Sequence, residues 1–359
     1  MNFDDLLRNP SSWLQGTGPE ADVVISSRIR LARNLADFPF IRQCTHTDRK
    51  GIESQIKQQL LDQPFFAEST FIDVSELSKL ERQLLVERQL ISQELSKTEG
   101  ARSVAIAKQE AFSLMINEED HLRIQVMESG FNLKETWDRI NELDDHLEER
   151  LTYAFHEKFG YLTACPTNVG TGMRVSVMLH LPALTMTDQV DKVFRSLQEI
   201  NLVVRGLYGE GSQSMGDLFQ ISNQLTLGKT EEELLAQVKE VVTEIIAFER
   251  KAREHLLLER KRELSDRASR AIGILSSAHT ITSEETMDLL SSLRMGIYLN
   301  LVTQMKIPDI NRIFLETQPA HLQKIYGGEL DTYDRNTERA QYLQRYLHKI
   351  SRSSDSSQN

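Results

Sequence analysis

The stretch NEEDHLR, residues 117–123, places three consecutive acids directly before a histidine and an arginine. Neighbouring carboxylates bind cations, coordinate metal ions or accept a proton as a general base. The alternative is a solvated hairpin turn, because asparagine and aspartate are common in turns and apolar residues flank the stretch. A turn explains the polarity, but it does not explain two glutamates followed by His121 and Arg123.

Paired arginines mark a second stretch, SSRIR at residues 26–30. If this stretch is a strand, alternation puts Arg28 and Arg30 on the same face of a sheet. Two adjacent guanidinium groups repel each other, and a phosphate group between them relieves that repulsion because its oxygens match their N–H groups. The alternative is an exposed edge strand whose charges only prevent association with other strands.

Two loops add a cysteine, a carboxylate and further arginines. In CPTNVGTGMR, residues 165–174, Cys165 is either a reactive thiolate in positive surroundings or a buried structural residue. In RGLYGE, residues 205–210, glycines would let the backbone approach a ligand, and a mobile surface loop is the alternative. Together, the four stretches suit a site in which arginines bind a nucleotide triphosphate and carboxylates face a cationic acceptor.

The elements that must position these residues differ between two parts of the chain. Over residues 20–250, strand-like and helix-like stretches are mixed, and strands are expected at 103–116 and 122–129, on either side of NEEDHLR. From Thr230, which forms a capping-box pattern with Glu233, the chain is almost entirely helical. We predict an α+β domain with an antiparallel sheet flanked by helices, then an all-α domain and a disordered tail. Their bounds are 1–250, 251–350 and 351–359.

Charge is unevenly distributed along the 359 residues. Residues 251–359 hold 16 of the 42 basic and 14 of the 53 acidic side chains. Residues 1–250 therefore hold 26 basic and 39 acidic side chains, which is a net charge of −13. Such a domain disfavours nucleic acid and favours a cationic substrate, unless the charge serves only solubility. We expect no transmembrane helix and no secretory signal, and the two distant cysteines indicate a reducing, cytoplasmic compartment.

These motifs resemble those of the phosphagen kinases, the creatine and arginine kinases. NEEDHLR and CPTNVGTGMR resemble two signature motifs of that family, and SSRIR and RGLYGE resemble two of its nucleotide-binding motifs. The likeness spans about residues 20–250. The kinases of free guanidines carry an additional N-terminal helical domain for which this chain has no room. Its helical C-terminal region instead resembles that of the family's bacterial protein-arginine kinases.

The resemblance implies transfer of the γ-phosphoryl group of ATP, with Mg²⁺, to arginine side chains of proteins. It further implies that phosphoarginine serves as a degradation tag in stress response, with a heat-shock repressor and damaged proteins as substrates. The implied partners are a zinc-containing activator and the Clp chaperone-protease, and the implied state is a cytoplasmic homodimer. A free-arginine phosphagen kinase and a non-catalytic phosphoarginine-binding adaptor are the alternatives.

The resemblance also implies residue roles. Glu119 would be the main catalytic carboxylate, Glu210 would pair with it on the acceptor guanidinium, and Cys165 would lie beside that group as a thiolate. Glu118 would hold Mg²⁺ through water, without a direct metal ligand, and the role of His121 is not implied. The implied ATP-binding residues are Ser26, Ser27, Arg28, Ile29, Arg30, Gln89, Arg123, Arg174, Val175, Ser176, Val177, Met178, Arg205, Gly206, Leu207, Tyr208 and Gly209.

Three positions depart from the family pattern. Tyr208 stands where phosphagen kinases have a second arginine, so one phosphate contact is lost or moved. Gln89 replaces a histidine that can stack on adenine. The helical domain would carry an allosteric phosphoarginine pocket in which asparagine replaces an aspartate, so the guanidinium of that ligand loses an ionic partner. This implied pocket consists of Arg335, Asn336, Arg339 and Ala340; a solvated helix face is the alternative.

Overall fold

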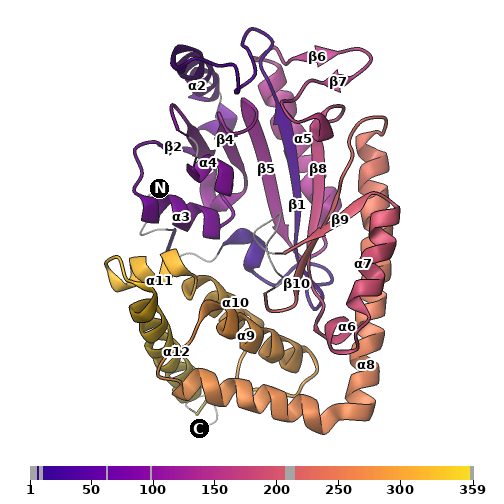
Figure 1. Ribbon diagram of the computed structural model, residues 1–359, viewed down its shortest axis with the longest axis vertical. Coiled ribbons are helices and arrows are strands. Elements are labelled where there is room, and N and C mark those ends of the chain that lie inside the picture. The colour runs from indigo at the N-terminus through magenta and orange to yellow at the C-terminus, as the bar shows by residue number, and fades with distance from the viewer. Residues whose placement is uncertain (1–5, 8–10, 62–63, 98, 207–214, 356–359) are drawn as a thin grey trace.

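The structure is a computed structural model that describes residues 6–7, 11–61, 64–97, 99–206 and 215–355. An eight-stranded antiparallel sheet occupies the centre of the N-terminal part (Figure 1), in the order β2-β3-β4-β5-β1-β8-β10-β9. The strands are β1 (Val24–Arg33), β2 (Thr70–Asp73), β3 (Ser103–Ile106), β4 (Ser113–Ile116), β5 (Leu122–Ser129), β8 (Met173–His180), β9 (Leu202–Arg205) and β10 (Leu218–Asn223).

The middle strands β5, β1 and β8 have one apolar and one polar face. On β1, Ile29 and Leu31 are buried in the main core, while Arg28 and Arg30 alternate with them and point to the other face. Helix α5 (Leu133–Glu148) packs against β1 and β5 and covers the apolar face (Figure 1). The polar face is therefore left available for a site.

Short elements connect these strands and shape the rim of the polar face. The stretch 103–116, which was expected to be one strand, is the hairpin β3–β4, because Gln109 and Glu110 adopt left-handed backbone angles that reverse the chain. The other elements of this part are η1 (Ser12–Leu14), α2 (His46–Leu61), η2 (Pro64–Phe66), α3 (Lys79–Glu87), α4 (Gln93–Lys97), η3 (Lys108–Glu110), β6 (Phe155–His156), β7 (Gly160–Tyr161), η4 (Pro166–Asn168), α6 (Pro182–Met186) and α7 (Val190–Glu199).

A long helix, α8 (Glu231–Ser277), links the sheet to the helical region. The Thr230 side chain accepts a hydrogen bond from the N–H of Glu233, which completes the expected capping box. The helix changes direction along its length (Figure 1), and Arg260 has non-helical backbone angles. Residue 250, the predicted domain boundary, lies inside this helix. The following helices are α9 (Ser283–Tyr298), α10 (Ile307–Glu316), α11 (Pro319–Tyr326) and α12 (Thr332–Asp355).

The helical region packs beneath the sheet (Figure 1) around a second core that includes Leu290, Leu293 and Ile313, joined by Trp13 and Met178. Helix α12 continues through residues 351–355 of the expected tail, since neither glycine nor proline interrupts its backbone there. Within the described residues, no helix combines the length and hydrophobicity needed to cross a membrane. The predicted fold class, an antiparallel α+β domain followed by an all-α region, is confirmed.

Candidate active site

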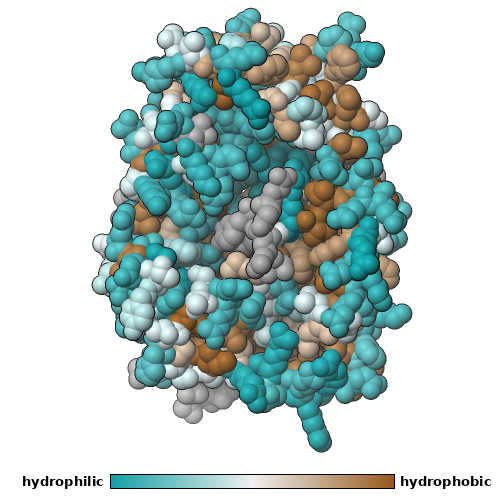
Figure 2. Space-filling model, viewed as in Figure 1, coloured by the Kyte–Doolittle hydropathy of each residue, from teal (hydrophilic) through white to brown (hydrophobic). Residues whose placement is uncertain are grey.

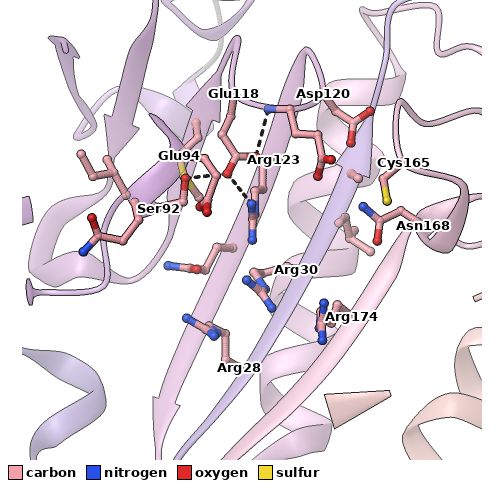
Figure 3. A pocket seen from close by; sticks show the side chains of 18 of the residues that line it. Arg28, Arg30, Ser92, Glu94, Glu118, Asp120, Arg123, Cys165, Asn168 and Arg174 are labelled. Atoms are coloured by element: carbon pink, nitrogen blue, oxygen red, sulfur yellow. Dashed lines mark hydrogen bonds and ion pairs between the residues drawn. The ribbon is translucent and has the colours of Figure 1, made fainter. Parts of the chain in front are cut away.

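A cavity of about 590 Å³ opens on the polar face of the sheet. Figure 2 views this side of the molecule, where hydrophilic side chains surround the hollow above the centre. Arginines from neighbouring strands converge on it (Figure 3), since β1 lies between β5 and β8 and Arg30 is directly opposite Arg174. The arginines lining the cavity include Arg28, Arg30, Arg123, Arg174 and Arg205.

Arg28 and Arg30 carry positive charge that burial and the neighbouring arginines make unfavourable. Burial, and then repulsion from Arg123, Arg174 and Arg205, lowers the pKa of Arg28 to about 9. Burial and neighbouring arginines hold the pKa of Arg30 well below its ordinary value, and the Arg30 Nε has no hydrogen-bond partner among the described residues. An anion with several oxygens would satisfy these groups, and a chain of phosphates fits that requirement.

Neutral side chains orient Arg28 without cancelling its charge. Its Nη1 donates to the amide oxygen of Gln89 at 3.0 Å, and its Nη2 donates to that of Gln220 at 2.7 Å. In the same way, the Ser222 hydroxyl accepts from Nε and Nη2 of Arg174 at 3.2 and 3.0 Å. These neutral acceptors hold the guanidinium groups in place without adding a countercharge of their own.

One ion pair marks the border between the arginines and the acids. Arg123 donates to the carboxylate of Glu118, which also accepts from the Ser92 hydroxyl at 2.5 Å. Burial raises the pKa of Glu118, but Arg123 and the hydrogen bonds outweigh it and the net shift is downward. Glu118 is therefore ionised, and it is almost fully buried.

The stretch NEEDHLR is the turn from β4 to β5, and two of its side chains hold it in place. Asn117 has φ +59°, and its amide donates to the carbonyl oxygens of Arg49 and Ala101 at 2.8 and 2.9 Å. His121 is completely buried; its Nδ1 accepts from the N–H of Leu35, and its Nε2 donates to the carbonyl oxygen of Pro39, both at 2.9 Å. His121 therefore links the turn to the segment after β1 by hydrogen bonds, a structural role that the resemblance did not imply.

Glu119 is half-buried and lines the cavity. Burial, and then the neighbouring carboxylates of Asp120 and Glu118, raises its pKa above the ordinary value. A carboxylate with a raised pKa is a stronger proton acceptor, which suits a general base.

Asp120 connects this turn to the loop that carries Cys165. Its Oδ1 accepts from the amide of Asn34 at 2.6 Å and from the N–H of Ala164 at 2.7 Å. The Cys165 sulfur lies 3.0 Å from the Thr167 hydroxyl and lines the cavity. Figure 3 shows Asp120 and Cys165 on the opposite side of the cavity from Arg28 and Arg30.

Glycine is required where this loop rejoins the sheet. Gly172 lines the cavity with φ +65°, and a Cβ atom there would lie 2.6 Å from the carbonyl oxygen of Ala32. Any larger residue would push the loop away from β1 and displace the Cys165 side of the cavity.

Several residues of the implied nucleotide site do not line this cavity. Ile29, Val175 and Val177 point into the core, and the Ser27 hydroxyl donates to the carbonyl oxygen of Gly130 behind the strand. Other implied residues, Ser26, Ser176 and Met178, line a small neighbouring cavity together with Arg28 and Gln89. Gly206 is buried beside the end of β9. Leu207, Tyr208, Gly209 and Glu210 lie outside the described residues.

The implied phosphoarginine pocket lies on α12. Arg339 is only 1% exposed and donates to the carbonyl oxygens of Thr317 and Ile281, both at 2.9 Å, and to the Asn336 side chain at 2.8 Å. Burial, with a smaller contribution from Arg335, lowers the pKa of Arg339 to about 10. The replacement Asn336 therefore binds an arginine of the same helix. Arg335 donates to the Leu330 carbonyl, and Ala340 is buried.

Sequence reasoning missed the residues that orient the site. Gln220 and Ser222 alternate with apolar residues along β10, so the strand period could have placed them on the polar face. Ser92 and Asn34 lie in connecting segments, and no local pattern points to them.

Two family models match the chain. The ATP:guanido phosphotransferase C-terminal catalytic domain matches residues 51–252, and the protein-arginine kinase McsB C-terminal domain matches residues 261–358. The protein-arginine kinase of Symbiobacterium thermophilum is 46% identical over 353 residues, which are 97% of this chain and 99% of that one. The protein-arginine kinase of Bacillus subtilis is 42% identical over 94% of this chain and 93% of its own.

The chain belongs to the protein-arginine kinase family. Solved structures of related phosphotransferases share the catalytic fold of this family member. A duplicated taurocyamine kinase from Schistosoma mansoni superimposes with a TM-score of 0.60 at 27% identity, covering 68% of this chain and 35% of that one. A lombricine kinase gives a TM-score of 0.58 at 27% identity, and the match covers 67% of this chain and 70% of that one.

Proposed function

We propose that this protein transfers the γ-phosphoryl group of ATP to arginine side chains of other proteins, giving phosphoarginine. The observation that carries the proposal is the cavity itself, in which a cluster of arginines that includes Arg28 and Arg30, whose pKa values are lowered, faces carboxylates and a cysteine. ATP is bound with Mg²⁺, as in the whole family.

Arg28, Arg30, Arg123, Arg174 and Arg205 bind the phosphates in this proposal. The orphan Nε of Arg30 and the depressed pKa values of Arg28 and Arg30 support that role, since both features reflect positive charge without a partner. Carboxylates suit Mg²⁺, and Glu118, which contacts Arg123 at the border of the arginine cluster, would hold the ion through water. The ion supplies neutralisation of the charge on the transferring phosphoryl group.

Glu119 acts on the acceptor in this proposal. A guanidinium has no nucleophilic lone pair and a pKa above 12, so it attacks phosphorus only when a base takes a proton. Glu119 orients the group and accepts that proton while the N–P bond forms and the bond from phosphorus to the ADP oxygen breaks. Its raised pKa and its place in the cavity support the role. We assign Cys165 to the other side of the guanidinium and Glu210, from its motif, to the second carboxylate.

Incubation with Mg²⁺ and ATP, and with either a folded basic protein or free arginine, tests the proposal. Mass spectrometry under neutral conditions would then locate acid-labile phosphate on arginine. We expect phosphate on the protein alone. Phosphate on free arginine alone would indicate a phosphagen kinase, and none on either would indicate a non-catalytic adaptor.

We extend the proposal to the partners that the family resemblance implies. These are a heat-shock repressor and damaged proteins as substrates, a zinc-containing activator, the Clp chaperone-protease, and a second copy of the chain, all in the cytoplasm. Light scattering tests the dimer, and titration with free phosphoarginine tests regulation through Arg335, Asn336, Arg339 and Ala340. Unchanged activity at saturating phosphoarginine would contradict that regulation.

A further inference from the structure

A buried carboxylate joins the helical region to the catalytic domain. Glu87, the last residue of α3, accepts hydrogen bonds from the N–H groups of Ala320 and His321 at 2.8 and 3.0 Å. The Nδ1 of the His321 ring lies 2.8 Å from the same carboxylate. Figure 1 shows α11 directly beneath α3, and the side chains of Glu87 and His321 are each only 1% exposed.

The His321 ring acts as a donor in this contact. Its Nε2 is buried and has no hydrogen-bond partner among the described residues, so a proton on that atom would be unsatisfied. The proton therefore resides on Nδ1 and is donated to Glu87. One carboxylate thus receives three N–H groups from the start of α11, which fixes the end of α3 against the helical region.

The chain runs directly from this contact to the nucleotide side of the cavity. Gln89, two residues after Glu87, has φ +62°, and its side chain orients Arg28. Its carbonyl oxygen accepts from the Gln125 amide at 2.6 Å. Between them, Arg88 is buried, pairs with Glu110 at 2.6 Å and accepts from the Trp13 indole through its carbonyl oxygen. A shift of Glu87 is therefore transmitted to Gln89 by a turn that is held at every residue.

The same contact continues into the helical region. Thr317, three residues before the first N–H donor, accepts from the buried Arg339 of α12 through its carbonyl oxygen. A series of packed and hydrogen-bonded groups therefore connects α12, the turn before α11, Glu87 and Gln89. Such contiguous contacts are the physical means by which one region sets the geometry of another.

We propose that Glu87 is a positioning residue through which the helical region sets Gln89, and with it Arg28, for binding the phosphates of ATP. The inference rests on the proposed function only in naming ATP as the ligand. It assigns the helical region an indirect part in nucleotide binding, since none of the described residues of that region lines the cavity.

The variant Glu87→Gln tests this role in the full-length protein. We expect the Kd for ATP, measured by calorimetry without any acceptor, to rise roughly tenfold, because the three N–H groups lose a charged acceptor and one carboxylate oxygen becomes a donor. The kcat at saturating ATP should change less than about threefold, because Glu87 touches no reacting group. Lys324→Gln is the matched control: Lys324 and Glu81 form an ion pair at 3.7 Å across the same two helices, but the pair is partly exposed and Glu81 lies six residues before Glu87 on α3. This control should leave the Kd within about twofold.

A double-variant cycle separates positioning from stability. If Glu87 acts through Gln89, ATP should bind Glu87→Gln/Gln89→Ala no more weakly than Gln89→Ala alone. The proposal would be overturned if the two substitutions raised the Kd for ATP by factors that multiply in the double variant. A lower Tm with unchanged ATP affinity in Glu87→Gln would also overturn it. Should Glu87→Gln not fold, His321→Ala keeps both backbone donors and should raise the Kd about threefold; no change there would also overturn it. Because binding is measured without an acceptor, a failure of arginine phosphorylation would leave this test intact.

Discussion

The two sides of the catalytic cavity are electrostatic opposites. On the side formed by β1, β5 and β8, burial and mutual repulsion lower the pKa values of Arg28 and Arg30. On the side formed by the β4–β5 turn, burial and neighbouring acids raise the pKa values of Glu119 and Asp120. Each side holds like charges close together in the absence of a ligand.

The protein therefore keeps two clusters of like charge on opposite sides of one cavity. Arg123 and Glu118 form an ion pair at the border between the two clusters. An anion relieves one cluster and a cation relieves the other, so ATP and an arginine side chain each find an unsatisfied partner. Preorganised groups of this kind contribute most when charge moves between two substrates.

Removing the proposed base from the acid side should have the largest effect. We expect Glu119→Gln to lower arginine phosphorylation by about 10²–10⁴-fold while the Kd for ATP changes little, because only the proton acceptor is lost. Mass spectrometry of the product and calorimetry of ATP binding measure the two quantities. Glu157→Gln, on the exposed β6–β7 hairpin, is the control. Turnover within about tenfold of wild type would show that Glu119 is not the base.

Removing a cation from the arginine side should have the next largest effect. We expect Arg30→Gln to lower kcat/KM by about 10²–10³-fold, as for loss of one preorganised charge, and to weaken ATP binding. The Tm of the ligand-free variant should not fall, since a repelled and partly unsatisfied charge is removed. Arg195→Gln on the surface of α7 controls for net charge. A lower Tm would show that Arg30 stabilises the ligand-free protein through its contacts with neighbouring groups.

The cysteine should matter less than either side's charged residues. We expect Cys165→Ser to lower kcat by about 10–10²-fold, the range for a misplaced substrate, with unchanged ATP affinity. Steady-state kinetics with varied protein substrate and varied ATP separate the two effects. Loss of ATP binding would show that Cys165 does not act on the acceptor side of the cavity.

The smallest effect is a pH dependence that differs in sign for activity and stability. The folded-state pKa of Glu119 is raised, so activity should rise with pH through a value above the ~4.3 of free glutamate. The same group contributes stability below its ordinary pKa and loses it as pH rises through the folded pKa. The Tm of Glu119→Gln minus that of wild type should therefore increase over this window. A constant difference would show that the pKa is not raised.

Alternation was sufficient to predict that Arg28 and Arg30 lie on the same face of the sheet. The sequence ISSRIRLAR permits only one register in which Ile29 and Leu31 enter the core, and that register places Arg28 and Arg30 together on the other face. The capping box at Thr230 was equally readable, because its hydrogen bonds are local in sequence.

Features that depend on distant contacts could not be predicted. Arg28 meets Gln220 across 192 positions of sequence, and no local pattern connects them. The β3–β4 hairpin was missed because its reversal at Gln109 and Glu110 uses neither glycine nor proline, and packing imposes the left-handed angles. His121 stands among the polar residues of NEEDHLR, but unlike Glu119 it does not line the cavity among the described residues. Its buried side chain instead forms hydrogen bonds with Leu35 and Pro39.

The three acids of the β4–β5 turn also bear on how the product leaves. An arginine arrives as a cation, but after transfer its side chain carries a phosphoryl group with about two negative charges. The net charge of the side chain therefore falls, so the carboxylates of the turn, Glu118, Glu119 and Asp120, hold the product less strongly than they held the substrate. The turn therefore favours dissociation after each transfer, and the enzyme is freed from the proteins that it has modified.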